Sequence, residues 1–109
     1  MSVTLYGIPT CDSCRKARRA LEAAGHGVEF RDVRAEPLAG SEWAEMVEAL
    51  GEGVVNRRSP SYRALEAETQ RLAPAALLAA APVVMKRPVI QAGDRWFLGW
   101  TPEVQAALV

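Results

Sequence analysis

The sequence predicts an α/β protein built on one mixed sheet, and three observations predict it. An alternating apolar run at 3–6 is followed by a helical pattern and then by a second alternating run at 28–32. Helical patterns fill about 38–82, and sheet patterns return after them. Because 109 residues can enclose one core, we expect a single domain, 1–109, with a helical insertion at about 38–82.

The first strand is expected to stop at Gly7, where a loop leads into a helix. Either Asp12 or Ser13 is a suitable N-cap for this helix. Its buried stripe is predicted to be Ala17, Ala20, Leu21 and Ala24. Residues 25–27 end the helix in a glycine turn. A crossover of this length makes the strands on either side of the helix parallel.

The insertion is predicted to contain helices joined by loops. Its expected elements are a helix capped by Ser41 with the stripe Trp43, Met46, Val47 and Leu50, a basic loop at 54–63, a short helix at about 62–68, and a helix at 73–81 that stops at Pro82.

After the insertion, strand patterns alternate with turns. The expected elements are strand at 83–85 and 89–91, a hairpin turn at 92–95, a returning strand at 96–98, and a final helix opened by Thr101 and Pro102 with Val104, Ala107 and Leu108 facing inward. A parallel first half, a helical insertion and an antiparallel second half followed by a helix make up a thioredoxin-like fold.

Both cysteines lie where the first strand is predicted to turn into the first helix. The first helical turn has unpaired backbone N–H groups and a partial positive charge, which favour a thiolate. Cys11 is therefore the candidate nucleophile, and Cys14, about one turn later, is the candidate resolving thiol. A disulfide between them would close a very short loop, so it would act as a switch and would stabilise little.

Two other interpretations of the C-x-x-C motif are weaker. A zinc site needs four ligands, but the chain has two cysteines and one histidine, and His26 lies at the far end of the helix. Inert cysteines usually lie on an apolar face and do not flank a helix start. Redox or nucleophilic chemistry is the remaining interpretation, and no metal is expected.

The start of the third predicted strand contributes a second part of the site. In thioredoxin-like folds a proline here is cis and faces the reactive cysteine, which is the role expected for Pro88; an ordinary edge-strand proline is the alternative. The candidate anion-binding residues are Arg15, Arg57, Arg58, Arg87 and Pro88. Guanidinium groups near Cys11 would lower its pKa and bind an oxyanion or carboxylate through two hydrogen bonds.

The charge balance disfavours some functions. With 13 Lys+Arg against 13 Asp+Glu, the formal net charge is zero, so binding to nucleic acid or to an anionic membrane through net positive charge is not expected. No leader-like segment and no apolar run long enough to cross a bilayer are evident. We therefore expect a cytoplasmic protein.

Four segments together resemble the arsenate-reductase-like (ArsC/Spx) family, most closely its small thiol-reductase and Spx-like branches. The segments are 5–17 with both cysteines, Arg58-Ser59, 86–90, and 98–100. The resemblance covers nearly the whole chain. It implies that Cys11 is the reactive cysteine, that Arg87 precedes the cis proline, and that Arg58 is the arginine of the insertion.

Departures from the family pattern favour a thiol substrate over arsenate. Glutathione-coupled arsenate reductases have a further arginine where this chain has Gly99-Trp100, and a loop arginine where it has Asn56. Cys14 provides the C-x-x-C switch typical of Spx, but the chain is short at its C-terminus for a transcriptional role.

The expected function is that of a thiol-disulfide oxidoreductase with no bound cofactor and with glutathione as co-substrate. Its expected partners are glutathione, glutaredoxin, or a thiol or oxyanion substrate. The alternatives are an Spx-type redox-sensing regulator that binds an RNA polymerase subunit and, second, an arsenate reductase.

Overall fold

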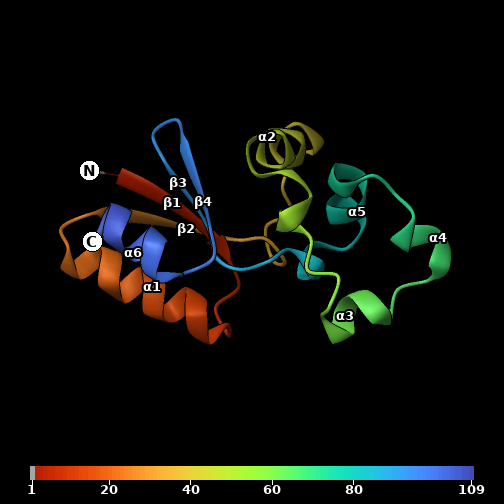
Figure 1. The fold of residues 1–109 in the computed structure, drawn as a ribbon, viewed down its shortest axis with the longest axis horizontal. Helices are drawn as coiled ribbons and strands as arrows, with labels where there is room; N and C mark the ends of the chain where they lie inside the picture. Colours follow the sequence, from red (N-terminus) through yellow and green to blue (C-terminus); the bar gives the residue numbers. More distant parts are fainter. Residues whose placement is uncertain (1) are drawn as a thin grey trace. The chain divides into compact units, whose positions relative to one another are not determined.

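The computed structural model describes residues 2–109 and divides into two compact units (Figure 1). The first unit contains the chain up to Asp32 together with Arg87–Val109, and the second is Val33–Lys86. The expected helical insertion at 38–82 lies within the second unit. That both units belong to one domain stays a prediction.

The first unit is built on a four-stranded mixed sheet with strand order β2-β1-β3-β4. The strands are β1 (Ser2–Gly7), β2 (Gly27–Asp32), β3 (Val89–Ala92) and β4 (Arg95–Leu98). β1 pairs in parallel with β2, placing Leu5 opposite Phe30, and antiparallel with β3, placing Leu5 opposite Ile90. β3 and β4 form an antiparallel hairpin. The topology confirms the predicted thioredoxin-like arrangement.

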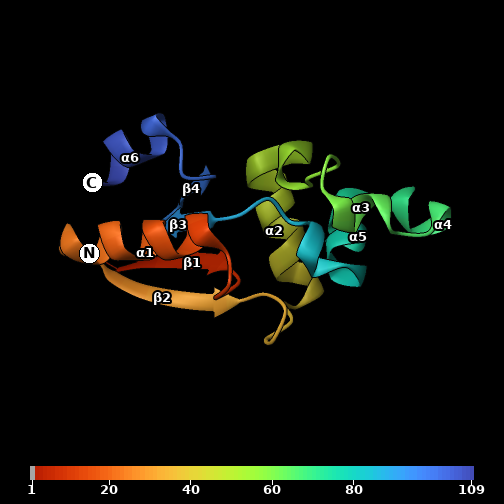
Figure 2. The same cartoon turned by 90° about the horizontal axis from the view of Figure 1, so that it is seen from below.

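Two helices share the apolar core on one face of this sheet (Figure 2). They are α1 (Asp12–Ala23) and α6 (Pro102–Leu108). The core consists of Val3, Leu5 and Ile90 from the strands, Cys14, Ala17 and Leu21 from α1, and Val104 and Leu108 from α6. Cys14 therefore belongs to the hydrophobic core as well as to the C-x-x-C motif.

Some predicted details of the first unit are wrong. Ala24 and Ala107 are exposed, although both were expected to face inward. Ala24 lies beyond the last residue of α1, and in α6 only Val104 and Leu108, one helical turn apart, are buried. The predicted hairpin is confirmed, and Gly93 has the positive φ of 64° that its turn requires.

The second unit is helical. Its elements are α2 (Gly40–Leu50), the 3₁₀ helix η1 (Gly51–Val54), α3 (Pro60–Arg63), α4 (Ala67–Gln70), α5 (Pro74–Ala80) and the 3₁₀ helix η2 (Pro82–Val84). Trp43 and Met46 of α2 are buried, as are Leu77 and Leu78 of α5, and the two helices pack against each other. These four side chains mark the buried, apolar faces of α2 and α5.

Three predictions for this region are wrong. Residues 83–85 are not a strand, because Pro82 starts a 3₁₀ turn and only Met85 pairs, in an isolated bridge with Val55. The helix expected at about 62–68 is split into α3 and α4. Ser41 is not the cap of α2.

The N-cap of α2 is Ala39, two residues before Ser41. The carboxylate of Glu42 accepts a hydrogen bond of 2.9 Å from the Ala39 N–H. The Ala39 carbonyl in turn accepts from the Glu42 and Trp43 N–H groups. The side chain of Glu42 thus satisfies a backbone donor at the helix start, so the helix begins without a hydroxyl cap.

None of the helices described for residues 2–109 has both the length and the apolar composition that crossing a bilayer requires.

Candidate active site

Cys11 is the N-cap of α1, where the sequence predicted Asp12 or Ser13. Its backbone is extended, with φ −79° and ψ 122°, and its N–H donates to the Ile8 carbonyl at 3.1 Å. The Cys11 carbonyl accepts the first helical hydrogen bond, from Arg15, at 3.1 Å. Because an N-cap side chain faces the free N–H groups of the first turn, the Cys11 thiol occupies the position where a capping oxygen usually lies.

The two thiols differ in access. Cys11 is half-buried, whereas Cys14, in the first turn of α1, has an exposed fraction of 0%. A reactant from solution can therefore reach Cys11 and not Cys14. This difference sets the order in which the two sulfur atoms can react.

Burial acts on the Cys11 thiol and by itself would raise its pKa. Hydrogen bonds from the backbone and side chain of Cys14, together with the hydrogen bond and positive charge of Arg87, outweigh burial and lower the pKa of Cys11 below its ordinary value. The Cys14 N–H, the Cys14 thiol and the Arg87 guanidinium thus all favour the Cys11 thiolate.

The pKa of Cys14 moves in the opposite direction. Burial, together with the negative charge of the Cys11 thiolate, raises the pKa of Cys14 to about 12, although the Ile8 N–H and the charge of Arg87 act against this rise. At neutral pH Cys14 is therefore a neutral thiol, and it donates its proton in a hydrogen bond to Cys11. One helix start thus holds, next to each other, a thiol whose pKa is lowered and a thiol whose pKa is raised.

The start of β3 brings Arg87 to Cys11 within the first unit. The Arg87-Pro88 peptide bond is cis, as predicted, and Pro88 is buried. The Pro88 carbonyl accepts a hydrogen bond of 2.8 Å from the Gly99 N–H, so that carbonyl is already paired. Of the four candidate arginines, Arg87 is the one whose guanidinium acts on the pKa of Cys11.

Arg15 is engaged elsewhere on the surface of α1. Its guanidinium lies 3.8 Å from the Asp12 carboxylate, which also pairs with Lys16 at 3.2 Å. All three side chains are more than half exposed, so these ion pairs add little to stability. The predicted role of Arg15 in anion binding stays a prediction.

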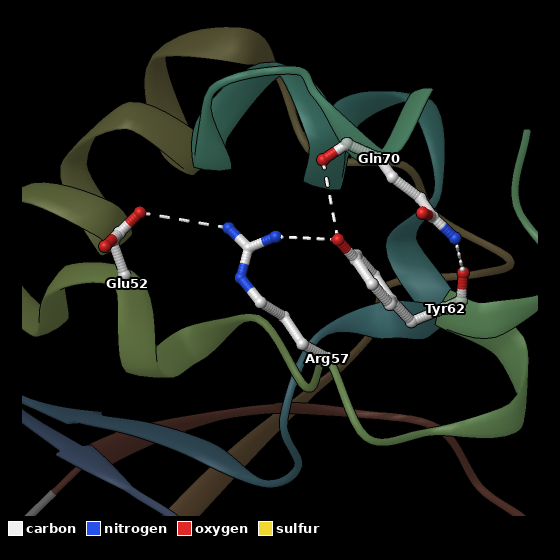
Figure 3. A network of polar contacts seen from close by, with 4 residues as sticks. All are labelled: Glu52, Arg57, Tyr62 and Gln70. Atoms are coloured by element: carbon white, nitrogen blue, oxygen red, sulfur yellow. Dashed lines mark hydrogen bonds and ion pairs between the residues drawn. The ribbon is translucent and has the colours of Figure 1, made fainter. Parts of the chain in front are cut away.

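Arg57, in the second unit, is held by a polar network that the sequence analysis missed (Figure 3). Its guanidinium donates to the Tyr62 hydroxyl at 2.8 Å, lies over the Tyr62 ring at 5.4 Å, and is 3.8 Å from the Glu52 carboxylate. The Gln70 side chain donates to the Tyr62 carbonyl at 2.9 Å. No short sequence motif predicts this network, because Glu52, Tyr62 and Gln70 come from three different helices, η1, α3 and α4.

Arg58 lines a cavity of about 270 Å³ that lies wholly within the second unit. The other residues around this cavity are Glu52, Gly53, Val55, Asn56, Arg57 and Lys86. The Arg58 N–H donates to the Asn56 side-chain oxygen at 3.2 Å, while the Arg58 side chain is exposed. The action of Arg57 or Arg58 on a ligand at Cys11 stays a prediction.

His26 lies at the other end of α1, as the sequence predicted. Its Nε2 atom is 2.6 Å from the Leu108 carbonyl oxygen, so it links the turn after α1 to the end of α6. Trp96 stacks on Tyr6 with ring centroids 5.9 Å apart. Both contacts are structural.

This chain aligns with most of the length of two curated relatives. The global transcriptional regulator Spx 1 of Oceanobacillus iheyensis is 31% identical over 109 residues, which span 93% of this chain and 82% of that protein. The global transcriptional regulator Spx of Listeria innocua is 30% identical over 107 residues, with the same two coverages, 93% and 82%. The sequence resemblance to Spx is thus confirmed, at about 30% identity.

Solved structures share the fold across nearly the whole chain. A protein named YffB (PA3664) superposes with a TM-score of 0.86 at 29% identity, covering 97% of each chain. An arsenate reductase (ArsC) related protein from Brucella melitensis has a TM-score of 0.74 at 30% identity and covers 98% of this chain and 93% of its own. An arsenate reductase from Vibrio cholerae, at 21% identity and a TM-score of 0.83 over 100% and 98% of the two chains, is similar in fold.

The family model described as "ArsC family" matches residues 6–108, from the end of β1 to the last residue of α6. This span contains both cysteines, the cis proline and the whole second unit. The chain belongs to the ArsC family.

Proposed function

We propose that this protein is a thiol-disulfide oxidoreductase that reduces mixed disulfides of glutathione. One observation carries the proposal: a reachable cysteine with a lowered pKa lies beside a fully buried cysteine with a pKa of about 12. A nucleophile and a resolving thiol need this division of protonation and access. Two cysteines that served only packing would not need it.

In the first step, the Cys11 thiolate attacks a sulfur of the substrate disulfide. A new S–S bond joins Cys11 to the glutathione sulfur, and the substrate S–S bond breaks. The departing sulfur keeps the electron pair and takes a proton from solvent, so the substrate leaves as a reduced thiol. The Arg87 guanidinium, which favours the Cys11 thiolate, remains as a positive group beside the glutathione adduct.

In the second step, Cys14 resolves the adduct. Once Cys11 is part of a disulfide it has lost the negative charge that helped to raise the pKa of Cys14, while the Ile8 N–H and the Arg87 charge still favour the Cys14 thiolate. Cys14 then loses its proton and attacks the Cys11 sulfur. Glutathione leaves with the electron pair and takes up the proton that Cys14 lost, so it departs as a thiol, and the Cys11–Cys14 disulfide forms.

Two further glutathione thiols return the enzyme to its dithiol form and leave as glutathione disulfide. The net reaction converts one mixed disulfide and one glutathione into a free thiol and glutathione disulfide. Glutathione is thus a co-substrate in the proposal, and no bound cofactor takes part in any step.

The reaction is tested with a peptide–glutathione mixed disulfide and reduced glutathione as the electron donor. We expect peptide thiol to be released catalytically and the enzyme, after one equivalent of oxidant, to lose the mass of two hydrogen atoms through the internal disulfide. A Cys11 that alkylates at neutral pH no faster than free cysteine, with no internal disulfide after mild oxidation, would contradict the proposal.

Arg58, and not Arg57, is the proposed second anion-binding residue. Both side chains are exposed at the cavity, but the Arg57 guanidinium is already engaged with Tyr62 and Glu52. Arg58→Ala is expected to raise KM for the glutathione mixed disulfide about tenfold, as expected for the loss of a charge-assisted hydrogen bond, with little change in kcat.

Arg57→Ala is the matched comparison for this prediction. It should lower the unfolding temperature by removing the contacts with Tyr62 and Glu52, and it should change KM little. An equal rise in KM in both variants, measured under the same conditions, would show that the two arginines do not differ in role.

A second candidate function follows from the relatives named Spx, at about 30% identity. In this alternative the same cysteine pair is a redox switch, and the partner is an RNA polymerase subunit. Binding of purified RNA polymerase that depends on the Cys11–Cys14 disulfide, together with no turnover of mixed disulfides, would favour the regulator over the enzyme.

A further inference from the structure

Gly7, the last residue of β1, has no room for a side chain. A Cβ atom added there would overlap the Cys14 Sγ atom and would lie 3.3 Å from the Cys14 Cβ. The backbone does not demand glycine, because φ of Gly7 is not positive. The glycines with positive φ are Gly25, Gly51, Gly93 and Gly99, and none of them lies against a cysteine. Gly7 is thus needed for the space that the Cys14 thiol fills.

The residue after Gly7 contacts both cysteines. The Ile8 N–H forms a hydrogen bond with the Cys14 sulfur, and the Ile8 carbonyl accepts from the Cys11 N–H at 3.1 Å. One backbone group of Ile8 therefore forms a hydrogen bond with each cysteine, directly after the end of β1. A shift of this segment would move both sulfur atoms relative to each other.

We propose that Gly7 is a positioning residue of the redox pair: by lacking a side chain, it lets the Cys14 thiol lie against the end of β1, within hydrogen-bond reach of Cys11. This inference rests on the proposed function, since it assigns Gly7 a role in the resolving step. Gly7 itself touches no substrate and acts only through Cys14.

The overlap with a methyl group at position 7 can be relieved in two ways. The sulfur can rotate about its single side-chain torsion, or the end of β1 can move away. Rotation costs less, because it displaces one side-chain atom and no backbone. Either change takes the Cys14 thiol from its hydrogen bond with Cys11, so the Cys11 thiolate loses one of the groups that stabilise it.

The variant Gly7→Ala tests the inference through the pH dependence of Cys11 alkylation. We expect the pKa of Cys11 to rise by about one pH unit, as the loss of a hydrogen bond to a charged group implies. We also expect the internal disulfide to form from the glutathione adduct at least about tenfold more slowly, because disulfide exchange needs the attacking sulfur in line.

The control is Gly27→Ala, at the start of β2. A Cβ there meets only the Ser2 hydroxyl, at 3.7 Å, which is an ordinary contact. This variant should have the wild-type alkylation profile and the wild-type rate of disulfide formation. Far-UV circular dichroism and thermal unfolding of both variants show whether each is folded.

A double-mutant cycle with Cys14→Ala separates positioning from a general loss of structure. Without the Cys14 sulfur the severe overlap disappears, and only the 3.3 Å contact with the Cβ atom of residue 14 remains, so adding Gly7→Ala should move the pKa of Cys11 little further. If Gly7→Ala alone does not fold, the Cys14→Ala background should restore folding. Equal shifts in the pKa of Cys11 in both backgrounds, or a folded Gly7→Ala variant with wild-type resolution, would overturn the inference.

The alkylation readout does not require turnover. Absence of catalysis in the wild-type protein would therefore contradict the proposed function alone. Absence of the Gly7→Ala effect in an active enzyme would contradict the role of Gly7 alone.

Discussion

Cys14→Ser is expected to stop the reaction after its first step and to hold the enzyme as a glutathione adduct on Cys11. The serine hydroxyl can fill most of the buried space of the thiol, but it cannot attack a disulfide. Intact-mass spectrometry after one equivalent of mixed disulfide should show one added glutathione per chain and one released peptide thiol. Wild-type protein treated in the same way should show the internal disulfide instead.

Cys11→Ser is expected to abolish the first step. The remaining cysteine is fully buried, and burial, the largest cause of its raised pKa, is still present without Cys11, so it can neither be reached nor readily supply a thiolate at neutral pH. We expect the release of peptide thiol to fall on the order of a thousandfold or more, as when an enzyme loses its nucleophile. Adduct formation on Cys14 in this variant would show that access to the two thiols does not follow their burial.

Wild-type turnover in Cys14→Ser would limit the role of Cys14. Glutathione would then resolve the adduct directly, and the buried thiol would serve only to stabilise the Cys11 thiolate. The adduct would not accumulate in that case, so the same mass measurement distinguishes the two outcomes.

The difference between the cysteines shows what sequence patterns can and cannot predict about this site. The strand ending at Gly7 and the helical spacing after it place both thiols at a helix start, where a thiolate is favoured. That argument applies to Cys11 and Cys14 alike. What separates them is burial by β1, β3 and α6, which depends on contacts between segments distant in the sequence.

The difference between local patterns and contacts of distant segments also explains which parts of the fold were predicted. The parallel first half and antiparallel second half of the sheet, the hairpin and the cis proline follow from local patterns and from the fold they imply, and the structure has them. The split of the expected helix at about 62–68 does not follow from local patterns. The Gln70 side chain donates to the carbonyls of Tyr62 and Leu65, taking up acceptors that a continuous helix would use.

Arg57 and Arg58 are adjacent in the sequence and equally basic, so no pattern could rank them. Only the position of the Tyr62 hydroxyl and the Glu52 carboxylate shows that Arg57 is engaged in its own unit. Gly7 was predicted only as the end of a strand. Its closeness to Cys14 depends on how the loop at 8–10 folds back onto α1, which the sequence does not reveal.

Arg87→Ala is expected to move the pH profile of Cys11 alkylation to higher pH. Arg87 donates a hydrogen bond to the Cys11 thiolate and acts on it with its positive charge, and both effects lower the pKa of Cys11. Cys11 is an acid whose charged form Arg87 stabilises. Losing Arg87 therefore raises the pKa, and less thiolate is present at neutral pH.

The size of the effect depends on two opposing terms. Where the pKa lies above the pH of the measurement, each unit by which it rises lowers the thiolate fraction about tenfold, but the remaining thiolate becomes roughly threefold more nucleophilic. The alkylation rate at neutral pH should thus fall by up to about threefold per unit. Turnover of a glutathione disulfide should fall further, because Arg87 is also proposed to bind the anionic substrate.

These two terms predict that the alkylation profiles of wild type and Arg87→Ala cross. Above both pKa values each protein is fully thiolate, so the variant, with the more basic sulfur, should react faster than wild type. Arg87→Lys, which keeps the charge but loses the planar fork, should lie between them. Arg19→Ala, on the exposed side of α1, controls for the loss of one positive charge and should follow the wild-type profile. A variant that is slower than wild type at every pH would mean that Arg87 holds Cys11 in position and does not tune its pKa.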